Sequence, residues 1–207
     1  MKPLPFVATG VANTASVRAA FARLGRELVP ATLVDVQAPA ALVLPGVGHF
    51  AAAMRVLQRL GFVEPLRQRM QRGAPTLGIC LGMQLCCEGS DEAPGIAGIG
   101  VVAGTVRRFG PDVRCPQMGW NGVAAPAGAG LLRTGHAYFA NSYALPDAPA
   151  GWRYATTDHG QPFVSALERD AVLLCQFHPE LSGAYGRDLL AGWLARADAA
   201  SSGEASC

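Results

Sequence analysis

Cys80 stands in the pentapeptide Gly78-Ile79-Cys80-Leu81-Gly82, in which two spaced glycines flank a potential nucleophile. An apolar run precedes this segment and a helical pattern follows it, which is the context of a nucleophile elbow. Glycines suit such a sharp turn because it leaves no room for neighbouring Cβ atoms. We expect Cys80 at the carboxyl end of a strand and at a helix N-terminus, whose dipole favours a thiolate. The alternative is a small buried cysteine in a glycine-rich turn.

His178 and Glu180 are candidates for the groups that a thiolate needs in acyl transfer, a general base and a residue that orients this base. His178 follows the apolar run 171–177, so we expect it at the carboxyl end of another strand. Pro179 delays any helix, which lets Glu180 lie near the imidazole. A lone histidine after a strand is more often a surface residue. The two strand-end sites together favour a triad of Cys80, His178 and Glu180.

Val47 is a candidate donor to the oxyanion of an acyl-transfer intermediate. It lies in Pro45-Gly46-Val47-Gly48, directly after a third apolar run. Glycines on both sides let its peptide turn, so that the N–H can point at a developing negative charge. The second donor would be the backbone N–H of Leu81, the residue after the nucleophile. A tight turn without function is the alternative, because a Gly-x-Gly sequence is weak evidence by itself.

Short apolar runs and helical patterns alternate along much of the chain. This alternation predicts an α/β fold with a doubly wound, mainly parallel sheet flanked by helices. From 98 to 163 the pattern becomes β-rich and punctuated by Gly and Pro, which indicates inserted antiparallel β-hairpins. We expect one domain over 1–200 and a disordered tail over 201–207. The predicted strands are 5–9, 28–34, 40–44, 74–79, 138–143, 152–156 and 171–177, and the predicted helices are 14–24, 54–60, 63–70, 81–88 and 185–197.

The composition narrows the class of protein. The chain has 207 residues and a net charge of +2, which is too small for a typical nucleic-acid binder. Charged residues make up 15% and hydrophobic residues 50%; this excludes a disordered chain and suggests association with a partner. No apolar run is long enough for a membrane span, and early prolines interrupt any signal-like segment. The six cysteines lack metal-ligand spacing, and we expect no metal or cofactor. Because no secretory signal is recognisable, we expect mostly reduced thiols and a cytoplasmic location.

Three motifs in this order resemble the class I, triad-type glutamine amidotransferases, which release ammonia from glutamine for a synthase partner. They are Leu44-Pro45-Gly46-Val47-Gly48, Gly78-Ile79-Cys80-Leu81-Gly82-Met83-Gln84 and Phe177-His178-Pro179-Glu180. The segments 117–121 and 176–182 are similar to one branch, the glutaminase subunits of imidazole glycerol phosphate synthase in histidine biosynthesis. This branch implies a heterodimer with a (β/α)8-barrel cyclase, which uses the ammonia to make imidazole glycerol phosphate and AICAR.

The resemblance also implies roles for individual residues. Cys80 would form the γ-glutamyl thioester, His178 would transfer protons, and Glu180 would orient His178. The positions that hold the amino and carboxylate ends of glutamine are Gly46, Gln84, Glu88, Ser142 and Tyr143. The residues implied to face the partner are Met118, Trp120 and Asn121, for which a buried aromatic and a turn asparagine are the alternatives.

The chain departs from the family pattern at several positions. Gln117 and Asn141 each replace a usual histidine, and Leu181 replaces a common lysine. The segment Ala8-Thr9-Gly10-Val11-Ala12-Asn13 differs from the usual Asp-Tyr-Gly-x-Gly-Asn. No triad member is affected. The departures leave open a glutaminase of a paralogous pair that acts on another substrate, such as a nucleotide sugar. A different class of alternative is a non-catalytic thiol sensor with Cys80 as its redox centre.

Overall fold

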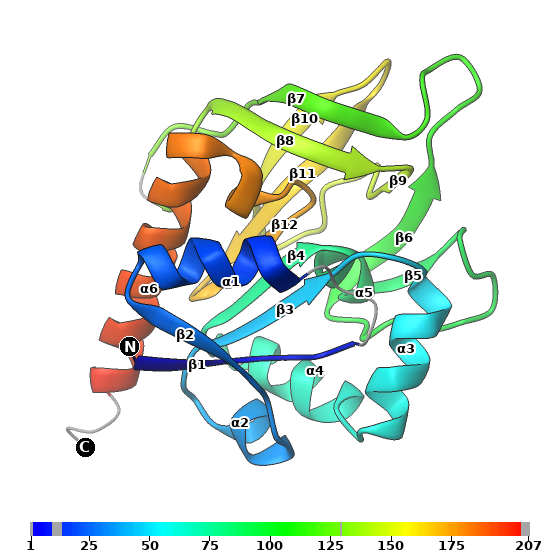
Figure 1. The fold of residues 1–207 in the computed structure, drawn as a ribbon. Helices are drawn as coiled ribbons and strands as arrows, with labels where there is room; N and C mark the ends of the chain where they lie inside the picture. The colour runs from blue at the N-terminus through cyan, green and yellow to red at the C-terminus, as the bar shows by residue number, and fades with distance from the viewer. Residues whose placement is uncertain (1, 10–13, 129, 204–207) are drawn as a thin grey trace.

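The computed structural model describes residues 2–9, 14–128 and 130–203 of the chain. Its centre is a seven-stranded sheet in the order β10-β11-β12-β4-β3-β1-β2 (Figure 1). The strands from β12 to β2 are parallel, whereas β10 and β11 extend one edge in antiparallel pairing. The predicted mainly parallel α/β sheet is therefore confirmed. Its strands are β1 (Lys2–Phe6), β2 (Arg26–Pro30), β3 (Leu42–Gly46), β4 (Thr76–Cys80), β10 (Arg153–Asp158), β11 (Pro162–Arg169) and β12 (Val172–Cys175).

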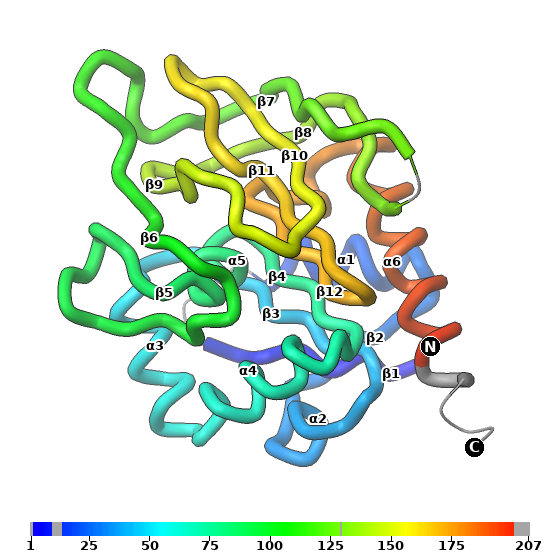
Figure 2. The backbone as a smooth tube through the Cα atoms, turned by 180° about the vertical axis from the view of Figure 1, so that it is seen from behind, coloured from blue at the N-terminus to red at the C-terminus, as the bar shows by residue number. Residues whose placement is uncertain are grey.

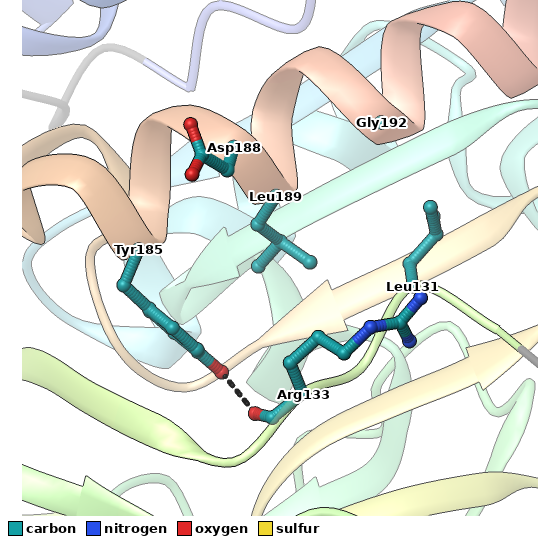
Figure 3. A pocket seen from close by; sticks show the side chains of 6 residues that line it. All are labelled: Leu131, Arg133, Tyr185, Asp188, Leu189 and Gly192. Atoms are coloured by element: carbon teal, nitrogen blue, oxygen red, sulfur yellow. Dashed lines mark hydrogen bonds between the residues drawn. The ribbon is translucent and has the colours of Figure 1, made fainter. Parts of the chain in front are cut away.

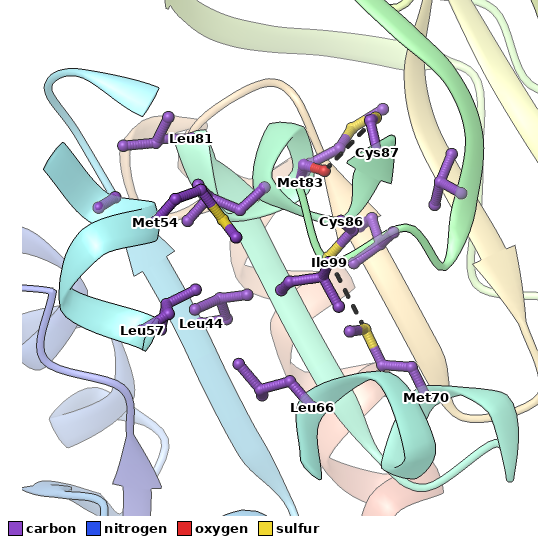
Figure 4. Packing of buried hydrophobic residues seen from close by; sticks show 14 of the residues in the cluster. Leu44, Met54, Leu57, Leu66, Met70, Leu81, Met83, Cys86, Cys87 and Ile99 are labelled. Atoms are coloured by element: carbon purple, nitrogen blue, oxygen red, sulfur yellow. Dashed lines mark hydrogen bonds between the residues drawn. The ribbon is translucent and has the colours of Figure 1, made fainter. Parts of the chain in front are cut away.

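Helices cover both faces of this sheet. Alternate residues of β3 face opposite sides, with Leu42 and Leu44 in one hydrophobic cluster and Val43 in the other. The cluster around Leu44 packs against α2 (Leu33–Gln37), α3 (Phe50–Arg59), α4 (Val63–Gln71) and α5 (Leu81–Leu85) (Figure 4). The cluster around Val43 packs against α1 (Thr14–Arg23) and α6 (Gly183–Gly203). The central strands are thus buried on both sides, as their continuous apolar sequences indicate.

The segment between β4 and β12 contains the predicted antiparallel hairpins. β7 (Gln117–Val123) and β8 (Gly135–Asn141) form a two-stranded hairpin, which lies beside β10 (Figure 2). β5 (Cys87–Ser90), β6 (Val102–Arg108) and β9 (Tyr143–Ala144) form a small mixed sheet. These insertions begin and end near the carboxyl end of the main sheet, so they supply one wall of any site there.

Two element predictions are wrong in informative ways. The strand predicted over 28–34 ends at Pro30, because Thr32 caps a short helix by accepting from the backbone N–H of Asp35. The helix predicted over 81–88 ends at Leu85 and is followed by β5. Its last carbonyl accepts from the N–H of Ile99, so the loop after β5 replaces the next helical turn.

Smaller differences affect element ends. The first strand begins and ends three residues earlier than predicted, and Leu60 lies just beyond α3 with 42% of its surface exposed. The predicted turn at 10–13, including Ala12 and Asn13, lies outside the described residues. α6 continues to Gly203, and the rest of the predicted tail also lies outside them. No helix in the described ranges has both the length and the apolar character needed to cross a membrane.

Arg69 of α4 ties together the loops at the amino end of the sheet. Its side chain is fully buried, and burial lowers the pKa of its guanidinium to about 10. Its five N–H donors are used on backbone carbonyls and a hydroxyl instead of a carboxylate. These acceptors are the carbonyls of Val36, Ala38, Ala40 and Pro75 and the Oγ1 of Thr76.

Candidate active site

Cys80 lies on a strained turn between β4 and α5. Its backbone has φ 52° and ψ −109°, a conformation that residues other than glycine rarely adopt. A Cβ atom at Gly78 would lie 2.7 Å from Leu174, and one at Gly82 would overlap the carbonyl oxygen of Leu44. The two glycines therefore allow the sharp turn that the pentapeptide indicates.

The register of the sheet aligns Cys80 with the other predicted catalytic segments. Gly46, at the end of β3, is paired with Cys80, and Cys175 of β12 is paired with Ile79. Because these three neighbouring strands are parallel, their carboxyl ends meet at one edge of the sheet. The segments that begin at Val47 and His178 are thereby placed on either side of the thiol.

His178 and Glu180 form a buried hydrogen-bonded pair beside Cys80. The Nδ1 of His178 lies 2.9 Å from Oε1 of Glu180, and the two side chains are 7% and 3% exposed. Burial lowers the pKa of His178, but hydrogen bonds to Cys80 and Glu180 and the charges of these groups raise it more. The net effect is a pKa well above the ordinary histidine value. The raised pKa thus favours the imidazolium that forms when His178 takes the proton of the thiol.

Backbone contacts hold the His178 segment against β8. The N–H of His178 donates to the carbonyl of Tyr138 at 2.8 Å. The hydroxyl of Ser182 donates to the carbonyl of His178 at 2.6 Å and accepts from the N–H of Tyr138 at 2.9 Å. His178 is therefore attached to the hairpin strand β8.

A pocket of about 240 Å³ opens above the thiol. This volume suits a ligand of amino-acid size rather than a nucleotide. Of the residues predicted from the sequence, Gly46 ends β3 behind the pocket without lining it. The lining residues are Val47, Gly48, Cys80, Leu81, Gln84, Glu92, Ala140, Asn141, Ser142, Tyr143 and His178.

Glu88 does not line this pocket, contrary to the sequence-based prediction. It is exposed on β5, and its carboxylate accepts from the N–H of Gly104 at 2.9 Å. Glu92 lines the pocket instead, and its Oε2 accepts from the N–H of Phe50 at 2.6 Å. Glu88 lies outside the pocket because α5 ends early, at Leu85, and the following strand β5 turns the Glu88 side chain toward solvent. The chain then comes back to the pocket at Glu92. The only sequence signal that could have indicated Glu92 is its position as a second glutamate four residues after Glu88.

Gln117 and Asn141, the two departures from histidine, lie opposite each other. They are paired across β7 and β8, and both are buried. The Nδ2 of Asn141 donates to the carbonyl of Tyr143 at 3.0 Å. Asn141 lines the pocket, whereas its partner Gln117 does not. Neither amide can titrate, in contrast to the two histidines that are usual at these positions.

Large apolar side chains are exposed next to the catalytic segment. Met118 and Trp120 of β7 are 67% and 59% exposed, and Leu181, in the segment that follows His178, is 43% exposed. Trp120 packs edge-on against Tyr138. Because more than half of its surface is exposed, its alternative interpretation as a buried aromatic is wrong. Asn121 is turned away, and its Nδ2 donates to the carbonyl of Asp158 at 2.8 Å. Met118, Trp120 and Leu181 are hereafter called the apolar face.

A second hollow, of about 300 Å³, lies between α6 and the segment before β8 (Figure 3). Leu131 and Leu189 line it together with Arg133 and Asp188. The hydroxyl of Tyr185 closes one side by donating to the carbonyl of Arg133 at 2.9 Å. None of its described lining residues is a cysteine, serine, threonine or histidine, whereas the pocket at Cys80 has both a thiol and an imidazole.

Comparison with known proteins gives both a family and a fold. Residues 12–195 match the family model described as "Glutamine amidotransferase class-I". The chain is 44% identical over 192 residues to the imidazole glycerol phosphate synthase subunit HisH of Deinococcus radiodurans, with 89% of each chain covered. It is 49% identical over 150 residues to a same-named subunit of Thermus thermophilus, covering 72% of this chain and 75% of the relative. A crystal structure of a glutamine amidotransferase has a similar fold, with a TM-score of 0.75, 20% identity and coverage of 94% and 98% of the two chains.

Proposed function

The chain belongs to the class-I glutamine amidotransferase family, and on this basis we propose that it is the glutaminase subunit of an imidazole glycerol phosphate synthase. It hydrolyses glutamine to glutamate and ammonia in histidine biosynthesis, as a single domain over 1–200 that acts in the cytoplasm. The observation that carries the proposal is the meeting of Cys80, His178–Glu180 and Val47 at three adjacent strand ends.

The chemistry begins with transfer of the Cys80 proton to His178. The thiolate attacks the side-chain amide carbon of glutamine, and the N–H groups of Val47 and Leu81 stabilise the resulting oxyanion. His178 then protonates the leaving nitrogen, and ammonia departs from the γ-glutamyl thioester. A water molecule loses a proton to His178, attacks the thioester and releases glutamate. Glu180 keeps the imidazole oriented through both transfers.

Substrate binding uses the far side of the pocket. Glu92 provides the carboxylate for the α-ammonium group of glutamine, the role expected of Glu88 from the sequence. Gln84 lies beside it and provides a neutral polar contact. Ser142 and Tyr143 also line the pocket, and their segment holds the α-carboxylate. Gly46 contributes by allowing the close approach of β3 to α5, since a Cβ atom there would lie 2.9 Å from Cβ of Leu81.

The partner is a (β/α)8-barrel cyclase that forms a heterodimer with this chain. Two observations support it, namely the subunit names of the relatives and the exposure of Met118, Trp120 and Leu181 beside the catalytic segment. Docking at this apolar face would enclose the site, so that ammonia reaches the cyclase without entering bulk water. The cyclase then uses it to form imidazole glycerol phosphate and AICAR.

Glutamine hydrolysis with and without a co-expressed cyclase subunit tests the proposal. We expect activity that rises in the complex and is lost in Cys80→Ala, with the variant still folded. Full glutaminase activity in Cys80→Ala would refute the triad. Co-purification with a different synthase would identify a paralogous pair, and a folded wild-type complex without any glutaminase activity would favour a thiol sensor.

A further inference from the structure

Three side-chain amide contacts lead from the wall of the pocket to the sulfur of Cys80. The Nε2 of Gln84 donates to the carbonyl of Tyr143 and to Oε1 of Gln176, both at 3.0 Å. The Nε2 of Gln176 donates to Sγ of Cys80 at 3.7 Å, a separation suited to a bond to sulfur. Gln176 is completely buried and Gln84 is 7% exposed. Of the two amides, Gln84 lines the pocket and Gln176 does not.

The direction of every bond in this chain follows from the backbone carbonyl at its start. A carbonyl can only accept, so Gln84 must turn its nitrogen toward Tyr143. The second N–H of the same nitrogen then requires an oxygen on Gln176, and this leaves the nitrogen of Gln176 facing Cys80. Turning Gln84 alone would place two acceptors against each other, and turning Gln176 alone would place two N–H donors against each other.

Strand alternation explains why Gln176 can reach this position. Cys175 and Phe177 point into the cluster with α6, whereas Leu174 points into the cluster with α5. Gln176 follows the alternation of Leu174 and therefore lies on the side of the sheet where α5 carries Gln84. Its own N–H is bound to the carbonyl of Ser165 at 2.9 Å, which holds its backbone at the end of β12.

We propose that Gln176 is a positioning residue with two effects, one on the nucleophile and one on substrate binding. Its N–H favours the thiolate form of Cys80, because a negative sulfur accepts a hydrogen bond more strongly than a thiol does. Its oxygen fixes the amide of Gln84, whose own oxygen is then directed to the pocket. No hydrogen bond to that oxygen is found among the described residues.

The second effect restricts what Gln84 can bind. Both of its N–H groups are used, so it offers the pocket only an acceptor. Gln84 therefore binds a donor of the substrate, the α-ammonium group, together with the carboxylate of Glu92, and it does not bind the α-carboxylate. This part of the inference rests on the proposed glutaminase function, whereas the effect on Cys80 does not.

The test for the first effect is the rate at which iodoacetamide alkylates Cys80 in the isolated chain, measured against pH. Fragment-ion mass spectrometry assigns the alkylated residue and separates Cys80 from Cys86 and Cys87, which lie in the same tryptic peptide. Gln176→Met fills the same space without an N–H donor. The groups near the sulfur that carry or gain charge are His178, Glu180, Glu92 and Tyr143, and they are unchanged in this variant.

We expect Gln176→Met to alkylate at Cys80 about tenfold more slowly at pH 7, with the rate profile moved to higher pH. The matched control is Ser165→Ala, which removes a buried hydroxyl on the neighbouring β11 that has no hydrogen-bond partner in the described part of the chain, and which keeps the backbone carbonyl that binds Gln176. It should retain the wild-type profile. A folded Gln176→Met protein whose profile coincides with that of the wild type would overturn the inference.

The KM for glutamine tests the second effect, and we expect about a tenfold increase in Gln176→Met beyond any change in kcat. A shifted alkylation profile in a chain that never hydrolyses glutamine would overturn the proposed function but keep the effect on Cys80. Normal hydrolysis with unchanged KM and alkylation in the variant would overturn this inference alone. If Gln176→Met does not fold, Gln84→Met is the second variant. It removes the N–H donor that holds the oxygen of Gln176, and it should also slow the alkylation of Cys80. An unchanged alkylation rate in Gln84→Met would count against the proposal.

Discussion

The α-carbon of Gly82 lies so close to the carbonyl oxygen of Leu44 that no Cβ atom fits between them. Gly82 belongs to the helix after the nucleophile, and Leu44 belongs to the strand that leads to the oxyanion segment. The contact therefore helps to set the distance between the N–H groups of Val47 and Leu81, which we propose bind one oxyanion. A side chain at this position has to separate them.

Gly82→Ala should accordingly damage catalysis as well as stability. We expect a loss of about 2 kcal/mol in the free energy of unfolding and about a hundredfold in kcat, because α5 must move away from β3. Denaturant unfolding and steady-state glutaminase assays measure the two effects. Gly110→Ala is the control, since a Cβ atom there meets nothing within 4 Å. Wild-type activity in Gly82→Ala would show that the contact does not matter.

Glu180→Gln should change the pH dependence of the reaction. Because the pKa of His178 is raised, its imidazolium form persists through neutral pH and is lost only as the pH rises through that value. The substitution keeps an acceptor oxygen but removes the negative charge, so the pKa falls. We expect the alkaline limb of the kcat/KM profile to move to lower pH, with activity reduced on the order of a hundredfold. An unshifted limb would mean that Glu180 does not support the charged imidazole.

Substitutions of Glu92 and Glu88 should have different effects, because Glu92 lines the pocket and Glu88 does not. Glu92→Gln should raise the KM for glutamine about tenfold or more, since a charge-assisted bond contributes about 1.5–3 kcal/mol. The amide can still accept from the N–H of Phe50, so the fold is preserved. Glu88→Gln should leave KM unchanged, because Glu88 lies outside the pocket. The reverse pattern in steady-state kinetics would restore the original expectation for Glu88.

Arg69→Met should destabilise the fold strongly without changing any residue that lines the pocket at Cys80. The substitution leaves several buried carbonyls without donors, and each such group costs about 1–3 kcal/mol. We expect the free energy of unfolding to fall by at least about 3 kcal/mol in urea titrations. Arg55→Met, at an exposed arginine of α3, serves as the control and should change it by less than about 0.5 kcal/mol. Equal stabilities of the two variants would contradict the role of Arg69.

The apolar face should determine partner affinity. Trp120→Ala should weaken binding of the proposed cyclase partner by about 2 kcal/mol, or roughly thirtyfold in Kd, as for an exposed aromatic anchor. Leu181→Ala should weaken it less, whereas Leu60→Ala should have no effect. Leu181 and Leu60 form a matched pair because they are 43% and 42% exposed. Calorimetric titration of the purified subunits measures the three affinities, and a uniform response would place the interface elsewhere.

The sequence predicted those features that depend on strand ends and glycine spacing. Cys80, Val47 and His178 each follow a buried strand, and parallel strands bring their ends together whatever the details of packing. It could not predict Glu92, because the choice between two nearby carboxylates depends on where α5 ends. That end is determined by the hydrogen bond between Ile99 and Leu85, which are far apart in the sequence. The capped helix α2 was missed because its apolar residues also suit a strand.

The position of β4 in the sheet has a consequence for dynamics. It is the central strand, with β12, β11 and β10 on one side and β3, β1 and β2 on the other, so fraying at either edge stops before it. The strained backbone of Cys80 is thus anchored in the part of the fold that opens only with global unfolding. Amide hydrogens of β4 should exchange more slowly than those of β2 or β10. On heating, the reactive geometry should be lost together with the whole fold and not in a separate earlier step.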